Sequence, residues 1–489
     1  MISIIILKEL KSILLSPKFP ATFGICSLLL LLSTFMGVKE YKAASVQAAS
    51  ARQLVEQEQH EATSWADLGN RVFREPDPMQ VFVAGVHNDV GRLSDVNATE
   101  GIKLTHSMYS DDPIFAVFRF MDFAFIVQVV FSLLAILFTY DAVNGEKEGG
   151  TLALTLSNAV PRARYIGGKL IGAWTGLAAP LSMPLMLSVL IVMVSGVPFH
   201  QSHWIRLAAL IGVSLLYFTF FIMLGVFISA VTRRSNVSFL LSLVAWIALV
   251  LIVPRAGVMA AGQLVRVPSV AELDGQIAAY SKDRWAQHME EMEKRWVERN
   301  AAMKGMSVVE RDAYREQHEW AWLEEDDAGR QEVQKDIDRQ SEKYKEDLRN
   351  RRQEQVRLGL SLSRVSPASS FQLAAMRLAG TDVGLKTRYE DAMQLYRQAF
   401  NAYREKKQKE SGNGGGGVRI TVDSDRGFSF SAPREAGTLD LGDMPVFTAP
   451  GGLLPDYLVP VMPDCTFLAI GGLLAFAGAV IAFLRYDVR

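Results

Sequence analysis

The chain offers one close pair of histidines as possible metal ligands, His200 and His203, in the run His-Gln-Ser-His. A protein metal site needs more ligands than two, so this pair is more typical of an interfacial loop. The nucleotide-binding pattern G-x-x-x-x-G-K-[ST] is absent, because Gly168-Lys169 lacks the upstream glycine and a following Ser or Thr. Neither G-x-S-x-G nor H-E-x-x-H occurs. We therefore expect no catalytic residue, no cofactor site and no metal site in this chain.

Arg119 and Asp122 are the charged residues of an otherwise apolar stretch, 115–140. They are three residues apart, so a helix would place them on one face. An acid inside a membrane-spanning helix is costly and is a functional candidate for that reason. Both residues lie near one end of the stretch, where Arg119 can pair with Asp122 or reach the polar surface. We favour a structural pair, with a substrate or proton role as the alternative.

The segment 141–169 is unusual for a linker. A charged stretch ends in Gly149-Gly150, and a short run of apolar residues and threonines, Thr151–Leu156, follows it. Pro161 then restarts the chain ahead of a basic cluster. A short apolar helix of this kind suits insertion into a groove of a partner protein. The alternative is a turn that lies against lipid.

The 489 residues are 49% hydrophobic and 21% charged, and the two classes are separated along the chain. Most charged residues lie in 40–112 and 255–409, whereas several stretches of about 20 residues elsewhere carry none. This separation excludes a plain soluble enzyme and a disordered chain. The 51 basic and 52 acidic residues nearly cancel, so the overall charge does not favour nucleic acid as a partner. The composition predicts a membrane protein with large parts in water.

A membrane span needs about 20 apolar residues to cross a hydrocarbon core of about 30 Å. The segments that meet this requirement are 19–38, 115–140, 170–199, 207–232, 235–254 and 465–484. The third contains Pro180 and Pro184, so we expect a kinked or irregular helix there. Residues 1–18 can place their isoleucines and leucines on one face, which predicts a helix lying in the membrane interface. An ordinary helical lead-in to the first span is the alternative.

Positively charged residues in short loops favour the cytoplasmic side of a membrane. In a six-span chain, both ends and the loops at 141–169 and 233–234 share one side. These segments hold Lys8, Lys11, Lys18, Arg162, Arg164, Lys169, Arg233, Arg234, Arg485 and Arg489. The short loop on the other side, about 197–206, holds Arg206 alone. We therefore expect both termini, including the tail 485–489, in the cytoplasm. The long segments 39–112 and 255–464 are then extracytoplasmic.

The two outer segments have mainly helical patterns. Residues 40–73 lack proline, so we expect the first span to continue as a helix up to Phe73. The capping box Ser269-Val-Ala-Glu272 starts a highly charged stretch that predicts a helical hairpin turning near 304–307. A further helix is predicted over 385–409, and alternation in 418–422 and 428–431 predicts a small β-hairpin. The expected apolar stripe of the helical hairpin is Leu273, Ile277, Tyr280, Met289, Met292 and Trp296.

The segment 141–169 resembles the corresponding loop of the ABC-2 class of ABC transporter permeases. That class typically shows acidic residues, a GTL-like step, a Leu-Ser-x-Pro-x-Arg-like stretch and a Gly-Lys pair before the next span. The matching pieces are Glu146, Glu148, Gly150-Thr151-Leu152, Leu156-Ser157, Pro161-Arg162 and Gly168-Lys169, with Ser157 and Pro161 four residues apart. Two further stretches, 75–85 and 366–381, resemble a subgroup with large outer segments. In that subgroup the second stretch looks like an amphipathic helix near the outer membrane surface.

The resemblance implies a permease subunit of the bacterial inner membrane that pairs with a second copy or a paralogue. Each permease would engage a separate cytoplasmic ATPase subunit, which binds ATP and Mg²⁺, and the loop 141–169 would transmit the movement of the ATPase to the spans. Leu152 and Leu156 are four apart, with Thr155 beside them, so we expect these leucines to be the apolar anchors. The implied contact residues are Glu146, Glu148, Gly150, Thr151, Leu152, Thr155, Leu156 and Arg162.

The sequence thus predicts a membrane α-helical protein with six transmembrane helices and a large, mainly helical extracytoplasmic domain that contains a small β-hairpin. The favoured function is the membrane subunit of an ATP-driven exporter. One alternative is a mechanical coupler that remodels a periplasmic or membrane partner while nothing crosses the bilayer. Another is a membrane-anchored scaffold or sensor. The outer domain is the expected place for substrate or for a periplasmic partner.

Overall fold

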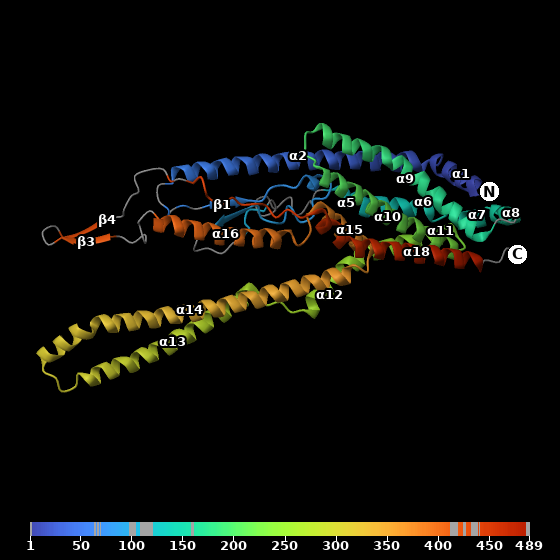
Figure 1. Ribbon diagram of the computed structural model, residues 1–489. Helices are drawn as coiled ribbons and strands as arrows, with labels where there is room; N and C mark the ends of the chain where they lie inside the picture. The colour runs from blue at the N-terminus through green and yellow to red at the C-terminus, as the bar shows by residue number, and fades with distance from the viewer. Residues whose placement is uncertain are drawn as a thin grey trace. The chain divides into compact units, whose positions relative to one another are not determined.

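The computed structural model describes residues 2–62, 65, 68, 70–96, 104–107, 121–157, 161–410, 419–423, 427–431, 439 and 441–485. By contacts the chain divides into two units, each described by itself below. Unit 1 comprises Met1–Ile252 and Ser366–Arg489, and unit 2 comprises Val253–Val365. Helices dominate both units (Figure 1).

Six helical stretches of the described chain are long and apolar enough to cross a membrane, which confirms the predicted number. They are Lys18–Glu61, Phe123–Glu148, Arg162–Val194, Gln201–Val231, Ser235–Leu264 and Leu454–Leu484. Most of these helices extend beyond the apolar segments of the sequence. The third starts at Arg162, so the last residues of the predicted loop 141–169 are already helical. The fifth continues from the predicted end at residue 254 to Leu264.

Some of these spans are built from several consecutive helical elements (Figure 1). The single long helices are α2 (Lys18–Glu61), α9 (Arg162–Val194), α10 (Gln201–Val231) and α18 (Met462–Leu484), the last preceded by α17 (Leu454–Leu458) and η4 (Val459–Val461). The second span contains α5 (Phe123–Phe125), the π-helical η2 (Ile126–Phe131), α6 (Ser132–Thr139) and α7 (Asn144–Glu148). The fifth contains α11 (Ser235–Trp246), the π-helical η3 (Ile247–Ile252) and α12 (Val253–Leu264). Pro180 and Pro184 both lie inside a continuous α9.

The helix α2 has 44 residues, about 66 Å at 1.5 Å per residue, so it projects far beyond a hydrocarbon core. Its predicted extension to Phe73 is wrong, because the helix ends at Glu61. Residues Asn70–Phe73 instead form β1, which pairs antiparallel with β2 (Leu93–Val96), in the register Asn70↔Val96. Tertiary packing explains the difference: Val72 and Val96 are buried in one cluster with Tyr389 and Phe400 of α16 (Leu385–Glu410). The helix predicted over 385–409 is confirmed by α16.

The helix α15 (Pro367–Ala379) corrects the expectation of an amphipathic helix near the outer membrane surface. Nearly all of its residues are buried, and the ring of Phe371 stacks on Tyr217 in the middle of α10, 4.7 Å between centroids. The hydroxyl of Ser366 donates to the carbonyl of Leu249 in η3 and caps the first turn of α15. Because small residues dominate this helix, it packs closely among the spans instead of lying on them.

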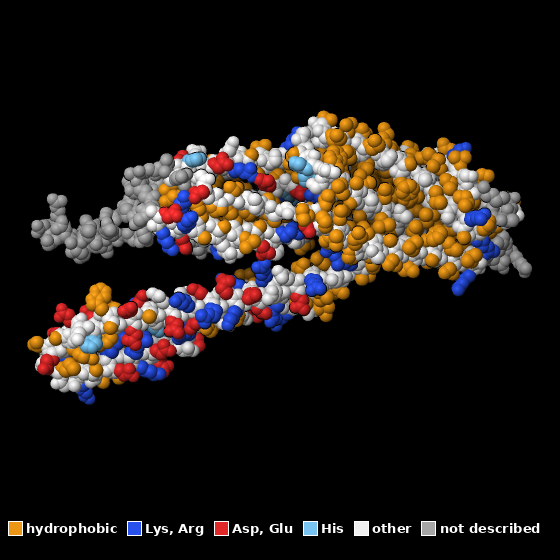
Figure 2. All heavy atoms as spheres, viewed as in Figure 1, with side chains coloured by type: hydrophobic (Ala, Val, Ile, Leu, Met, Phe, Trp, Pro, Cys, Tyr) orange, Lys and Arg blue, Asp and Glu red, His pale blue; other side chains and the backbone are white. Residues whose placement is uncertain are grey.

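Unit 2 is a helical hairpin. The helices are α12, α13 (Val270–Ala302) and α14 (Val308–Ser363), and the turn between the last two contains Gly305 at φ +99°, as predicted. The hydroxyl of Ser269 accepts from the backbone N–H of Glu272 at 3.1 Å, which confirms the Ser269 half of the predicted capping box. Basic and acidic side chains are mixed over its visible face, whereas hydrophobic side chains cover the visible face around α9 and α18 (Figure 2).

The predicted apolar stripe of this hairpin is wrong at two positions. Met289 and Trp296 are 63% and 66% exposed. Leu273 is buried as predicted, and the other buried residues of α13 and α14 include His288, Val333 and Ile337. Ion pairs join the two helices, since Arg299 donates to Asp326 at 3.1 Å.

The predicted β-hairpin is confirmed. Strands β3 (Arg419–Asp423) and β4 (Gly427–Ser431) pair antiparallel, with Arg419 opposite Ser431 and Asp423 opposite Gly427. The turn between them, 424–426, lies outside the described residues.

Candidate functional site at the α7–α8 loop

Two short helices, α7 and α8 (Thr151–Ser157), form the candidate coupling loop. Gly150 has φ +68°, a left-handed conformation that only glycine adopts without strain, and it reverses the chain between the two helices. The hydroxyl of Thr151 donates to the carbonyl of Glu146 at 3.4 Å across this turn. Both helices lie at the end of unit 1 where α1 (Ile2–Leu14) and the C-terminal turn of α18 also lie (Figure 1). We call this end the α8 end.

The apolar residues of α8 do not point where the sequence suggested. Leu152, expected as an exposed anchor, is 2% exposed and packs with Val143, Tyr165, Val226 and Phe483 in the core of unit 1. Leu156 also packs partly against this cluster. The exposed leucine is Leu154, at 69%. The expectation that Leu152 and Leu156 face outward together is therefore wrong, because the face they share is the one that holds α8 to its own chain.

Glu146 is the centre of an ion-pair network at the α8 end. Its Oε1 lies 2.7 Å from Nζ of Lys8 and 2.8 Å from Nζ of Lys169. Its Oε2 accepts the hydroxyl hydrogen of Tyr165 at 2.7 Å. Lys169 also reaches Glu9 Oε2 at 2.7 Å. Burial raises the pKa of Glu9, and the neighbouring ammonium of Lys169 opposes that shift. The network connects α7 to α1 and α9.

Three glycines of α9 make room for α1. A Cβ at Gly168, Gly172 or Gly176 would meet Ile5, Glu9 or Ile13 respectively, at 3.0, 2.6 and 3.3 Å. The two sets repeat every four residues, so one groove of α9 receives one face of α1. The predicted helix within residues 1–18 is present as α1, and its face with Ile5, Glu9 and Ile13 packs on α9. Its position in the membrane interface stays a prediction.

Glu148 and Asn144 connect α7 to the turn between α10 and α11. Glu148 accepts hydrogen bonds from the backbone N–H and the hydroxyl of Ser235, at 3.0 and 2.7 Å. The buried side chain of Asn144 donates to Thr232 Oγ1 at 3.0 Å, and its backbone N–H donates to Ser229 Oγ at 3.2 Å. A carboxylate at the start of α11 is favourable because the first backbone N–H groups of a helix lack partners.

Arg162, at the start of α9, holds the end of α18. Its Nη1 donates to the carbonyls of Phe483 and Leu484, at 3.1 and 2.6 Å. Carbonyls in the last turn of a helix lack intrahelical donors, so a cation there is favourable. Tyr165 stacks on Phe483 one turn further along α9, with centroids 5.1 Å apart. Of the predicted residues, Arg162, Glu146 and Glu148 hold the loop in place, and Thr151 and Thr155 lie on its more exposed part.

Asp122, outside this loop, connects the start of α5 to the chain at Ala84. It precedes α5, where its Oδ1 accepts from Phe125 N at 2.8 Å and its Oδ2 accepts from Ala84 N at 3.0 Å. Its predicted partner Arg119, like residues 115–120 of the predicted span, lies outside the described residues. Asp122 has an extended backbone and precedes α5, so it does not lie on a helical face as the sequence predicted.

Sequence reasoning missed Glu9, Tyr165 and Lys169 as members of the site. Glu9 and Lys169 are 160 residues apart, and no local pattern links them. The available signal was the spacing Gly168-x₃-Gly172-x₃-Gly176, which marks a close helix contact. A helix with Ile5, Glu9 and Ile13 at the same spacing, directly before the first span, was a suitable partner for that groove.

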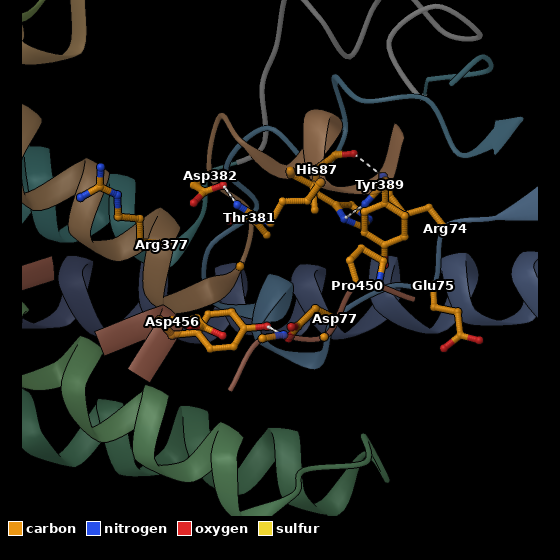
Figure 3. A pocket seen from close by; sticks show the side chains of 16 residues that line it. Arg74, Glu75, Asp77, His87, Arg377, Thr381, Asp382, Tyr389, Pro450 and Asp456 are labelled. Atoms are coloured by element: carbon orange, nitrogen blue, oxygen red, sulfur yellow. Dashed lines mark hydrogen bonds and ion pairs between the residues drawn. The ribbon is translucent and has the colours of Figure 1, made fainter. Parts of the chain in front are cut away.

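A second polar region lies at the other end of unit 1, near α16. A cavity of about 310 Å³ opens there among charged side chains (Figure 3). Figure 3 shows Arg74, His87 and Tyr389 close together on one side of the opening and Asp77 and Asp456 on another. Asp77 is bound by Arg206 of α10 at 3.1 Å, and Arg206 also donates to the carbonyl of Leu378 at 2.6 Å. Arg206, which the sequence placed in the loop 197–206, thus lies in α10 and holds the end of α15 in place.

The family model described as ABC-2 family transporter protein matches residues 3–389, well over half of the chain. The match includes the α7–α8 loop, its ion-pair network and most of the spans. A search among curated proteins found no match. Proteins of this family are the membrane components of ABC transporters and work with an ABC ATPase. With its six candidate spans, the chain therefore belongs to the ABC-2 family of transporter proteins, as a multi-pass membrane permease and not as the ATPase.

Proposed function

We propose that this chain is the permease subunit of an ATP-driven exporter and that the α7–α8 loop receives the movement of the ATPase. The observation that carries the proposal is the environment of α8. One side of this short helix is packed on the core through Leu152, and the opposite side presents Leu154, 69% exposed. A partner that moves α8 would move α1, α9, α10, α11 and α18 with it, because Glu146, Glu148 and Arg162 join them.

Leu154 has the chemistry of an anchor. Burying one leucine in a partner groove is worth about 1.5–3 kcal/mol. An aspartate at the same place would lose that contribution and put a charge into a desolvated contact. The ATPase would supply the bound ATP and Mg²⁺, and we expect no cofactor in the permease.

The α8 end would lie in the cytoplasm of a bacterium, with both termini, and the chain would reside in the inner membrane. In a six-span chain, the N-terminal segment and the loop between the fourth and fifth spans lie on the same side of the membrane as the α8 end. These two segments hold Lys8, Lys11, Lys18, Arg233 and Arg234, and basic residues favour the cytoplasmic side. Cysteine labelling tests the orientation after replacement of Cys26 and Cys465, both free thiols. In intact spheroplasts, an impermeant maleimide should label Glu346→Cys and leave Ser157→Cys unlabelled. The reverse pattern would overturn the orientation.

The coupling role is tested by matched aspartate variants of α8. Leu154→Asp should leave the yield and the thermal stability of the permease near normal and should remove the ABC ATPase that co-purifies with the wild-type chain. Leu152→Asp places a charge in the core, so it should lower the yield of folded permease instead. Retention of a fully stimulated ATPase by Leu154→Asp would show that this loop is not the coupling element.

The same permease would pair with a second copy or a paralogue, since each ABC transporter needs two membrane halves for its two ATPases. Co-expression of two differently tagged copies tests this directly. Capture of one tag by the other supports a homodimer, and capture of a related permease supports a heterodimer.

A mechanical coupler is the second candidate, favoured by the continuity of α2. One helix runs from the first span into the β1–β2 region outside, so a tilt of the span would move the outer part of unit 1 as a lever. A periplasmic or membrane partner at the outer domain would then be remodelled without transport. Proteoliposomes containing the purified complex separate the candidates, because only the exporter moves a compound across the bilayer on ATP addition.

A further inference from the structure

A second cavity of unit 1, about 320 Å³, lies between α2 and the β1–β2 region. One wall is formed by Ala44, Ala48 and Ala51 of α2, whose small side chains leave the space open. The polar lining comes from Gln47, Arg74, His87, Arg92 and His106. No Asp or Glu is among the described residues that line it.

Arg74 and His87 form a buried pair between this cavity and the cavity of Figure 3, which both residues also line. Nη1 of Arg74 lies 2.7 Å from Nδ1 of His87, and Nη2 donates to the carbonyl of His87 at 2.7 Å. A guanidinium can only donate, so Nδ1 is the acceptor and the imidazole carries its proton on Nε2. That Nε2–H has no hydrogen-bond partner among the described residues, although His87 is only 4% exposed.

Arg92 brings a second guanidinium to the cavity. The backbone N–H of Arg74 donates to the carbonyl of Arg92 at 2.9 Å, which holds the two arginines near each other. Nη1 of Arg92 donates to Gln47 at 2.8 Å, but its buried Nε has no hydrogen-bond partner in the described chain. The nearby acid Glu40 accepts from Asn88 at 2.5 Å. The charge of Arg92 acts on Glu40, but within the described chain their charged atoms are too far apart for an ion pair.

The cavity thus holds two guanidinium groups and an imidazole N–H. Among the described residues, no carboxylate forms an ion pair with either arginine, so an anion is missing. Burial, and to a smaller extent Arg92, lower the pKa of Arg74 to about 10, while Tyr389 opposes this shift. An oxyanion in the cavity would give Nε2 of His87 an acceptor and would balance the charge of the Arg92 guanidinium. Planar guanidinium groups are well suited to phosphate.

We propose that the cavity between α2 and the β1–β2 region is a binding site for a phosphate group, held by Arg92, Arg74 and the Nε2–H of His87. The alanine wall accommodates the body that carries the phosphate. Ala44 and Ala51 lie about 9 and 20 Å along α2 from residue 38, the end of the apolar segment, whereas a headgroup layer is about 5–8 Å deep. The cavity therefore begins just beyond the headgroup layer. A free phosphate compound can reach it from the water, and a phospholipid can reach it only if its headgroup moves outward from the bilayer.

The test uses the full-length protein purified in detergent. Inorganic phosphate and glycerol 3-phosphate are titrated by calorimetry, and native mass spectrometry detects phospholipid retained from vesicles of phosphatidylglycerol and phosphatidylcholine. Binding of the soluble compounds assigns a free ligand, and retention of phospholipid alone assigns a headgroup. Absence of binding in every arm would overturn the proposal.

Two variants connect any binding to this cavity. Arg92→Gln should weaken binding about tenfold or more, since a charge-assisted hydrogen bond is lost. Ala48→Leu fills the cavity without changing charge and keeps a good helix former, so it remains informative if Arg92→Gln folds poorly. The controls are Arg71→Gln, an exposed arginine outside the cavity, and the exposed neighbour Ala49→Leu. Wild-type affinity in both test variants would refute the site and would leave the proposed coupling role of α8 untouched.

Discussion

Lys169 Nζ lies 2.7 Å from Oε2 of Glu9, and this ion pair joins the first helix of the chain to α9. Both side chains are at most 8% exposed. Bare charges are expensive to bury, so each depends on the other and on Glu146, which lies 2.8 Å from the same ammonium group. The pair therefore makes the position of α1 dependent on α7, which is where a signal from a partner at α8 would enter.

Lys169→Met should destabilise the permease strongly. The substitution leaves Glu9 and Glu146 near each other without the shared cation, and removing one member of a buried pair typically costs about 3–5 kcal/mol. The thermal midpoint in detergent, followed by fluorescence-detected size exclusion, should fall clearly. The double variant Glu9→Leu/Lys169→Met should recover part of the loss. An unchanged midpoint for Lys169→Met would show that the network contributes nothing to folding.

Gly172→Ala should loosen the contact between α1 and α9. The added Cβ would lie 2.6 Å from Cβ of Glu9 and 3.1 Å from the carbonyl oxygen of Ile6, so the helices must separate. Overpacking of this kind typically costs about 1–3 kcal/mol. Gly167→Ala is the matched control, because nothing lies within 4 Å of its Cβ. Limited proteolysis near residue 15 measures the effect, and equal protection of both variants would contradict the close packing.

The sequence predicted the spans well because a membrane demands long apolar helices, and that demand is local. It also predicted the turn at Gly150 and the short helix after it. The direction of Leu152 was not predictable, since α8 is apolar on more than one side and only the packing of Val143 and Phe483 decides which side is buried. For the same reason β1 was mistaken for helix: its pairing with β2 and its contact with α16 are made by distant residues.

Asp122→Ala should cost more stability than Asp122→Asn. Asparagine keeps one oxygen to accept from Phe125 N at the start of α5 but cannot accept from Ala84 N as well. Alanine loses both hydrogen bonds, and an unsatisfied buried donor costs about 1–3 kcal/mol. Yield and thermal midpoint should fall in the order wild type, Asn, Ala, while transport activity per folded molecule stays similar. Normal yield with abolished activity in Asp122→Asn would instead assign this acid a role with substrate or protons.

Acidification should destabilise the part of unit 1 around β1 and β2 through His87. Burial, with Arg74 and Arg92 nearby, holds the pKa of His87 well below its usual range. The unfolded chain takes up a proton at this histidine below about pH 6.5 while the folded chain does not, so the free energy of unfolding falls as pH falls. The contribution of one group is at most about 1.4 kcal/mol per pH unit. It is present in full above the unfolded pKa and is lost progressively below it.

The measurement is the thermal midpoint of the full-length protein between pH 7.5 and 5.5. His87→Gln removes the titrating ring and keeps an acceptor for Arg74, so its midpoint should depend less on pH than that of the wild type. His60→Gln, at an exposed position of α2, should keep the wild-type slope. Equal slopes in wild type and His87→Gln would mean that His87 takes up a proton in the folded protein as readily as in the unfolded chain. Arg74 could then not donate to its Nδ1, and the tautomer that leaves Nε2–H free for a phosphate oxygen would be wrong.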